Sequence, residues 1–181
     1  MISFAIYRLP DTDTCVKISS DSMPKHLSSY AELENKSGFV FAPFCLDNDS
    51  LLLISPDKIE VMKCEETQGV DEETKLDVSF DRDAYREDFE CFHSNLLDAS
   101  FDKLVLSRTI SVDSSIEKRA ISLFVKACKM YPHQFVSLVS TPESGTWLMS
   151  TPEVLLEKGS DTSKWHTMAL AGTMKTPGPW S

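Results

Sequence analysis

The sequence has no uninterrupted apolar run of the roughly 20 residues that a transmembrane helix requires. Its N-terminus lacks a basic region followed by a long apolar core, so it shows no secretory signal. It also has no stripe of basic residues, and its net charge of −10 argues against a nucleic acid partner. These absences predict a cytoplasmic protein that neither spans a membrane nor binds nucleic acid.

The 5 cysteines and 4 histidines show none of the close spacings that are typical of metal sites. No C-x-x-C or H-x-x-x-H pair is present, and neither is a P-loop, a G-x-G-x-x-G or a G-x-S-x-G motif. An odd cysteine count without an export signal favours reduced thiols, several of them filling the core. The sequence therefore predicts no metal site within this chain.

The length of 181 residues, with 41% hydrophobic and 25% charged residues, is typical of one soluble globular domain or a large part of one. Charge is distributed unevenly along it. Residues 51–100 contain 14 Asp and Glu but 5 Lys and Arg, whereas residues 101–181 contain 7 acidic and 9 basic residues. A small anionic ligand is therefore expected in the second part of the chain.

The hydrophobic patterns predict an α+β fold with antiparallel sheets and outer helices. Helical spacing predicts a helix over 82–98, with its aromatic stripe in the core, and another helix capped by Ser114 and Glu117. A short helix is expected within 22–35, and residues 65–80 are expected to form a loop. Strands are predicted at 2–8, 14–18, 38–44, 51–55, 103–110, 135–140, 147–150, 154–158 and 166–171.

Three features in the second part could carry chemistry. Lys103 begins an apolar strand, where loss of solvation would lower its pKa and suit a general base. Glu153 lies between apolar strand segments that would raise its pKa and suit a general acid. The small residues of LAGT at 170–173 would let the backbone approach an anion. Taken singly, these residues could equally be an edge-strand lysine, a turn glutamate in water and a strand-ending glycine.

In combination, the three segments resemble the chorismate-utilising enzymes, and most closely the isochorismate synthases. The stretch FDKLVLSR at 101–108 is similar to the family's lysine strand, K-V-V-L-[SA]-R. MSTPE at 149–153 resembles its G-x-S-P-E-x-L segment, with Met149 and Thr151 replacing the usual glycine and serine. Residues 170–173 match its L-A-G-T loop, and 38–44 resemble an early strand of some members.

The resemblance implies the addition of water at C2 of chorismate and loss of the C4 hydroxyl, in menaquinone or siderophore biosynthesis. Lys103 would activate the water, and Glu153 would protonate the departing hydroxyl. Ala171, Gly172 and Thr173 would line the chorismate pocket. Salicylate synthases share the lysine and the glutamate, and aminodeoxychorismate synthases use an equivalent lysine as a nucleophile. Anthranilate synthases generally have another residue at that position, so Lys103 argues against them.

Family members are longer than this chain. Residues 1–181 are therefore expected to be the N-terminal portion of a single chorismate-binding domain, with an entry region at 1–100 and the start of the catalytic region at 101–181. The family's Mg²⁺ ligands are expected beyond residue 181, and this portion alone is expected to be inactive. It is also expected to self-associate through the surface left by the missing portion.

Two other possibilities stay open at this point. One is a non-catalytic half-domain from a truncated gene, which another chain could complement. The other sets the resemblance aside and leaves a small cytoplasmic α+β domain that binds an unknown ligand.

Overall fold

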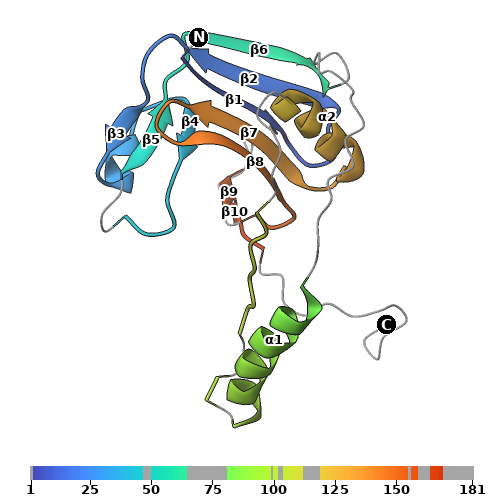
Figure 1. Cartoon of the computed structure of the whole chain (residues 1–181). Coiled ribbons are helices and arrows are strands. Elements are labelled where there is room, and N and C mark those ends of the chain that lie inside the picture. Colours follow the sequence, from blue (N-terminus) through green and yellow to red (C-terminus); the bar gives the residue numbers. More distant parts are fainter. Residues whose placement is uncertain are drawn as a thin grey trace. The chain divides into compact units, whose positions relative to one another are not determined.

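The computed structural model describes residues 2–46, 50–64, 81–98, 100–101, 104–111, 119–154, 156–158 and 164–168 (Figure 1). The chain forms two compact units. One unit consists of Met1–Asp71 together with Glu117–Ser181, and the other consists of Glu72–Ile116. Antiparallel sheets and helices make the described chain α+β, as predicted.

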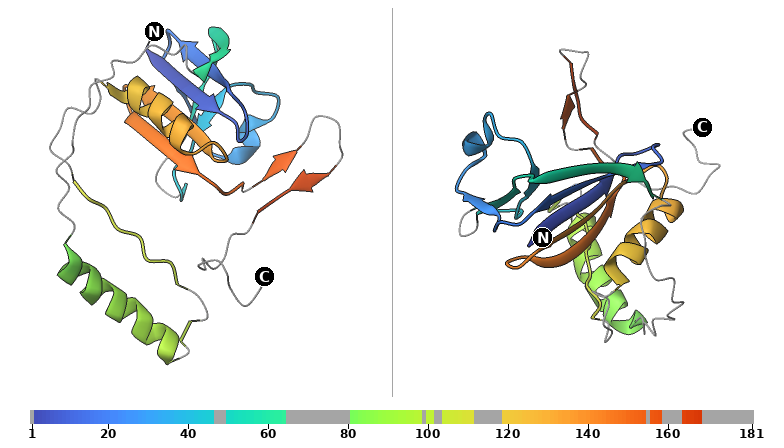
Figure 2. Two further views of the ribbon diagram at one scale, coloured as in Figure 1. Left: turned by 90° about the vertical axis from the view of Figure 1, so that its right-hand side faces the viewer. Right: turned by 90° about the horizontal axis from the view of Figure 1, so that it is seen from above.

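The larger unit is built on a five-stranded antiparallel sheet in the order β6-β2-β1-β7-β8 (Figure 2). Its central strand, β1 (Ser3–Arg8), pairs on one side with β2 (Thr14–Ser20) and on the other with β7 (Phe135–Thr141). The outer strands are β6 (Lys58–Lys63) and β8 (Gly145–Thr151). Strand β1 therefore lies between β2, which follows it in the sequence, and β7, which comes from the second half of the chain.

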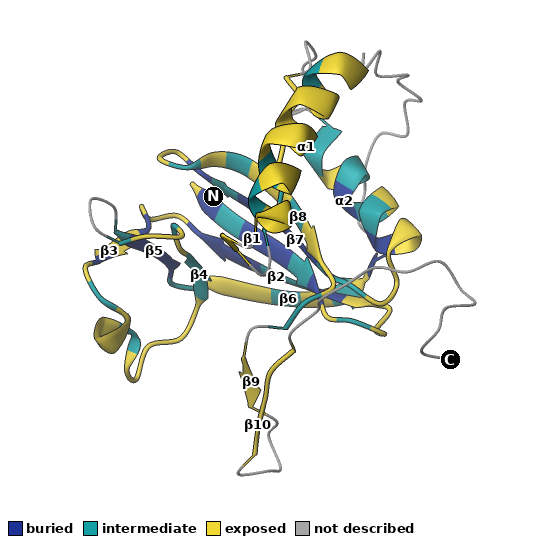
Figure 3. Cartoon of the chain, turned by 90° about the horizontal axis from the view of Figure 1, so that it is seen from below, coloured by how far each residue is buried: buried dark blue, intermediate teal, exposed yellow. Residues whose placement is uncertain are grey.

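Helix α2 (Ala120–Met130) covers one face of this sheet. Phe124, which is fully buried, packs there with Ile6 of β1 and Leu138 of β7. These two strand residues are register partners, so their side chains point to the same face. Figure 3 shows the buried residues concentrated on the central strands and on the inner side of α2.

A three-stranded antiparallel sheet packs against the opposite face. Its order is β3-β5-β4, with β3 at Lys25–Leu27, β5 at Leu51–Ile54 and β4 at Phe39–Phe41. Ile54 joins a core with Ala5 and Val139 of the large sheet. Gly38 begins β4 with φ +148°, and a Cβ there would lie 2.3 Å from the Ile54 carbonyl oxygen. Only glycine therefore allows this close approach.

Most of the predicted strands are confirmed where the structure describes them. The segments predicted at 2–8, 14–18, 135–140 and 147–150 form β1, β2, β7 and β8. The predicted hairpin of 38–44 with 51–55 is the antiparallel pair β4–β5. The segments 154–158 and 166–171 are shorter than predicted, because only β9 (Glu157–Lys158) and β10 (Trp165–His166) form strands among their described residues.

Three local predictions are confirmed only in part or fail. Residues 22–35 contain the expected short helix as the 3₁₀ helix η1 (Tyr30–Leu33), but it is preceded by strand β3. Residues 104–110 form no strand, so the prediction for 103–110 fails over its described part. Strand β6 was not predicted, and its sequence, KIEVMK, mixes charged and apolar residues. The predicted loop at 65–80 and the capping box at Ser114 lie outside the described residues.

The smaller unit contains α1 (Arg82–Leu97), as predicted. Asp81 caps this helix, because its carboxylate accepts hydrogen bonds from the N–H groups of Asp83 and Ala84 at 3.1 and 3.0 Å. The prediction that its aromatic stripe is core is wrong, since no described residue of α1 is buried and Tyr85 and Phe89 are 40% and 47% exposed. Helical spacing identifies an apolar face but not the element that covers it.

The expectation of reduced thiols is wrong for Cys15 and Cys64, which form a disulfide. These residues are 49 positions apart in the sequence. Cys15 lies on β2, and Cys64 directly follows β6, so the pairing of these two strands brings the cysteines together. The Cys64 N–H also donates to the Asp13 carbonyl at 3.0 Å. Cys45, Cys91 and Cys128 are free.

No helix within the described residues is long and apolar enough to cross a membrane. Apolar side chains are exposed on the edge strand β6, where Ile59 and Val61 are 58% and 69% exposed. Self-association through such a surface stays a prediction.

The packing of α2 generates a stability prediction. Phe124→Ala should lower the free energy of unfolding by about 3–5 kcal/mol, because it leaves a cavity between α2 and the sheet. Denaturant unfolding measures this loss. Phe44→Ala is the matched control, since Phe44 is fully exposed and its removal should change stability by less than about 0.5 kcal/mol. Equal losses in the two variants would contradict this packing.

A second prediction concerns Asp57, whose carboxylate accepts hydrogen bonds from the Ser20 hydroxyl and the Asp21 N–H, both at 2.8 Å. The Asp21 N–H, followed by the Ser20 hydroxyl, lowers the pKa of Asp57 below its usual value. The stabilisation is therefore present above the unfolded-state pKa and is lost as the pH falls through the folded-state pKa.

Asp57→Asn should consequently reduce stability at pH 7 more than at pH 3. The denaturant midpoints of both proteins at the two pH values measure this difference. A gap between the midpoints that stays constant on acidification would show that the ionised carboxylate is not the stabilising form.

Candidate active site

Glu153 follows directly after β8 in the larger unit. Strand β8 ends at Thr151, and Pro152, which has no N–H to donate to a ladder, stops the pairing. The Glu153 N–H donates to the Thr151 hydroxyl at 3.3 Å, which closes a short turn. The side chain of Glu153 is half-buried.

This glutamate lines a cavity of about 480 Å³, a size within the range typical of small-molecule sites. Four of the lining residues are polar or acidic and the others are apolar. The polar members are Thr12, Thr151, Glu153 and Glu157, and the apolar members are Leu9, Pro10, Phe135, Val154 and Leu156. Glu153 therefore presents a carboxyl group to a largely apolar hollow, as an acid–base residue requires.

Residues 164–168 lie beside the segment that contains Glu153, because backbone hydrogen bonds join the two segments. Strands β9 and β10 form an antiparallel hairpin in which Trp165 pairs with Lys158 and His166 with Glu157. The Met168 N–H then donates to the Val154 carbonyl at 2.8 Å, one residue from Glu153. The chain leading to the LAGT segment thus runs beside the glutamate. Ala171, Gly172 and Thr173 themselves lie outside the described residues.

Lys103 also lies outside the described residues, and its sequence position belongs to the smaller unit. Beyond it, Leu104 and Leu106 are half-buried while Val105 is 75% exposed, so the two faces alternate as the sequence suggests. The structure does not test whether Lys103 and Glu153 act together as the general base and the general acid, so their joint role stays a prediction.

Arg108, at the end of the lysine motif, holds its segment against α1. Its Nε lies 3.2 Å from the Asp88 carboxylate, and another guanidinium nitrogen donates to the Asp81 carbonyl at 3.3 Å. The guanidinium also lies 5.8 Å from the centre of the Tyr85 ring. The motif arginine therefore has a structural role within the smaller unit.

The described residues do not supply a site suited to Mg²⁺. The one described cluster of three potential ligands consists of Cys15, Cys64 and Cys128, and Mg²⁺ prefers oxygen ligands. The requirement for Mg²⁺ stays a prediction.

A second cavity, of about 600 Å³, lies beside β8 and was not predicted. His26 lies at its edge, with Nδ1 2.6 Å from the Ser50 hydroxyl and Nε2 2.7 Å from the Glu143 carboxylate. Phe41 and Trp147 form part of its apolar wall, with ring centres 5.8 Å apart. These residues come from separate segments with no shared motif, so no local pattern could have identified this cavity.

Comparison with protein families gives one match. Residues 41–178 match the family model described as chorismate binding enzyme, which covers well over half of the chain. No curated protein and no solved structure matches. The matched range includes all three sequence motifs and the cavity residues from Phe135 to Glu157.

Proposed function

This chain belongs to the chorismate binding enzyme family, and we propose that it carries part of the active site of an isochorismate synthase. The observation that supports this proposal is the position of Glu153. The family-like STPE segment places this glutamate at the wall of a cavity, beside the strand that leads to the LAGT segment.

In the proposed reaction, Glu153 is the general acid. Water attacks C2 of chorismate, the bond from C4 to its hydroxyl breaks, and the ring double bonds shift between them. Glu153 donates a proton to the departing hydroxyl, which leaves as water. Val154 and Phe135 form apolar parts of the cavity wall beside this carboxyl group.

Lys103 is the proposed general base that takes a proton from the attacking water. One proton is removed and one is supplied, so the reaction is a net isomerisation without an external oxidant or reductant. Gly172 and Thr173 are proposed to contact the substrate with backbone N–H groups and a hydroxyl.

Product analysis distinguishes isochorismate synthesis from the related reactions. Because residues 1–181 alone are expected to be inactive, the full-length product of the complete reading frame is purified and incubated with chorismate and Mg²⁺. Its products are identified by chromatography and mass spectrometry. Isochorismate alone is the expected product. Salicylate with pyruvate, or an aminated product formed only with added ammonia, would overturn the isochorismate assignment in favour of a relative. The absence of any conversion would overturn the enzymatic proposal.

Substitution of the two proposed catalytic groups gives a sharper test. Lys103→Ala and Glu153→Gln should each lower kcat by about 100- to 10,000-fold, the usual contribution of a general base or acid. Glu34→Gln is the matched control for the carboxyl group, because Glu34 is exposed and does not line the cavity. Lys126→Ala is the control for the amine, because Lys126 is exposed on α2. Near-normal turnover in either catalytic variant would remove that residue from the mechanism.

A further inference from the structure

Three cysteines from separate elements meet in the core of the larger unit. Cys15 lies on β2, Cys64 follows β6, and Cys128 lies on α2. All three are buried, and their sulfur atoms lie within 4.8 Å of one another. The disulfide uses only Cys15 and Cys64, so a third sulfur is placed beside it without a covalent partner.

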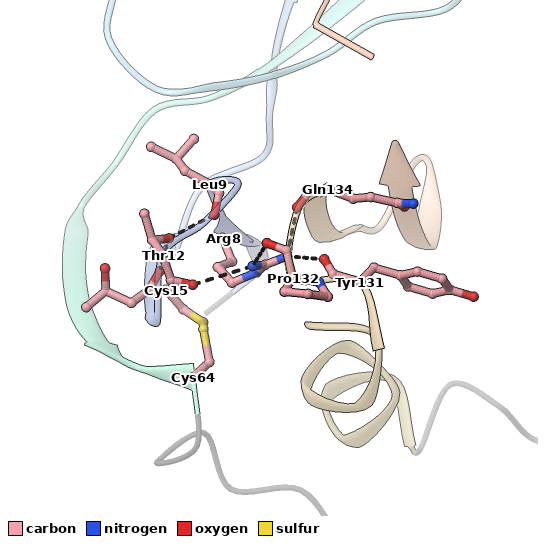
Figure 4. Close-up of a disulfide and its surroundings, with 9 residues drawn as sticks. Arg8, Leu9, Thr12, Cys15, Cys64, Tyr131, Pro132 and Gln134 are labelled. Atoms are coloured by element: carbon pink, nitrogen blue, oxygen red, sulfur yellow. Dashed lines mark hydrogen bonds between the residues drawn. A yellow bond between two sulfur atoms is a disulfide. The ribbon is translucent and has the colours of Figure 1, made fainter. Parts of the chain in front are cut away.

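A buried positive charge lies beside this sulfur cluster. Arg8 is 3% exposed and faces Cys15 directly across the β1–β2 ladder (Figure 4). Its guanidinium donates to the carbonyls of Tyr131, Pro132 and Gln134 at 2.6, 2.6 and 2.7 Å. These carbonyls are neutral, and none of the ion pairs found among the described residues includes Arg8.

One atom of Arg8 remains unsatisfied. Its Nε is buried and has no hydrogen-bond partner among the described residues. A buried charge without a counter-ion is costly, and the cavity beside Arg8 is lined by Cys64 and Cys128 as well as by Asp13. A negatively charged metal–thiolate cluster would place a counter-ion beside the buried guanidinium.

We propose that Cys15, Cys64 and Cys128 bind a thiophilic divalent cation of the Zn²⁺ class when the Cys15–Cys64 disulfide is reduced. Tetrahedral Zn²⁺ binds cysteine sulfur at about 2.3 Å, which places its ligands about 3.8 Å apart. The sulfur atoms, all within 4.8 Å, can reach this spacing through small side-chain rotations.

Charge balance favours a divalent over a monovalent ion. Three thiolates and a divalent cation carry one net negative charge, which the Arg8 guanidinium neutralises. With a monovalent cation such as Cu⁺, the three thiolates and Arg8 would keep one net negative charge in the core, while Asp13, Lys63 and Lys129 lie at the exposed lining of the adjoining cavity. A cavity of about 320 Å³, lined by Arg8, Cys64 and Cys128, has room for a water molecule as the fourth ligand.

Occupation of the site is coupled to thiol redox state. A dithiol reductant supplies two electrons and two protons, the bond between Cys15 and Cys64 breaks, and the reductant becomes a disulfide. Metal binding then displaces the three thiol protons. The disulfide joins only neighbouring strands, whereas a three-sulfur site would also fasten α2 to the sheet.

Metal titration of the 181-residue chain tests this proposal independently of chorismate chemistry. The chain is reduced with a phosphine, which does not compete as a thiol ligand, and is dialysed against ZnCl₂ under anaerobic conditions. One Zn²⁺ per chain and the release of three protons are expected. The oxidised chain should not bind at this site. Equal uptake by oxidised and reduced chains would overturn the proposal.

Single cysteine substitutions assign the ligands. Cys128→Ser should lower Zn²⁺ affinity by more than about tenfold, because even outer contacts of a metal site contribute that much. Cys45→Ser and Cys91→Ser are the matched controls, because both thiols are free and exposed. The Zn²⁺ affinity of both control variants should equal that of the unmodified chain. A Cys128→Ser protein that binds equally well would overturn the proposal.

A spectroscopic measurement keeps the test decisive if Cys128→Ser fails to fold. X-ray absorption of the zinc-loaded, unmodified chain should show three sulfur neighbours at about 2.3 Å. A shell with fewer than three sulfurs would overturn the assignment. Disulfide mapping of the oxidised chain should find Cys15 joined to Cys64. A large fraction of Cys128 in a disulfide would instead identify a centre of thiol–disulfide exchange.

Discussion

The pairing of β1 with β7 is the constraint on which the larger unit depends. It joins Ser3–Arg8 to Phe135–Thr141, so the core is closed by strands far apart in the chain. Helix α2 packs on one face of these strands and the small sheet on the other. Strand β8 then pairs with β7, which sets the position of Glu153 at the end of the sheet. A weakened β1–β7 pair would therefore disturb the core and the candidate site together.

Two separate polar features result from this arrangement. At the end of β8, the chain turns at Pro152 and places a carboxyl group in a cavity that can hold a small molecule. At the end of β1, Arg8 carries a buried charge beside three sulfur atoms. The first feature belongs to the segment with family-like motifs, while the second has no counterpart in those motifs. Metal binding by the reduced sulfur cluster would affect the rigidity of the unit, whereas the proposed chemistry requires Glu153 and Lys103.

Much of the fold could be predicted because its signals are local. The apolar run of β1 and the alternation in β7 identified strands, and helical spacing with the Asp81 cap is consistent with α1. The failures have a common physical origin. The strand predicted from Lys103 onwards has apolar residues in the correct alternation, but a strand also requires a neighbour to accept its hydrogen bonds. The aromatic stripe of α1 likewise required a partner surface, and the described residues of its unit leave Tyr85 and Phe89 exposed.

The sequence by itself determined membership of the chorismate binding enzyme family, because the lysine, glutamate and LAGT motifs are short contiguous segments whose residue types can be recognised without coordinates. It also indicated most strands, since period-two alternation is a local property. Only the tertiary structure decided which distant side chains meet. Glu153 lines a cavity, and Cys15, Cys64 and Cys128 form one cluster, because long-range strand pairing and helix packing bring their segments together. Such contacts depend on packing across the fold, which no local pattern of residues encodes.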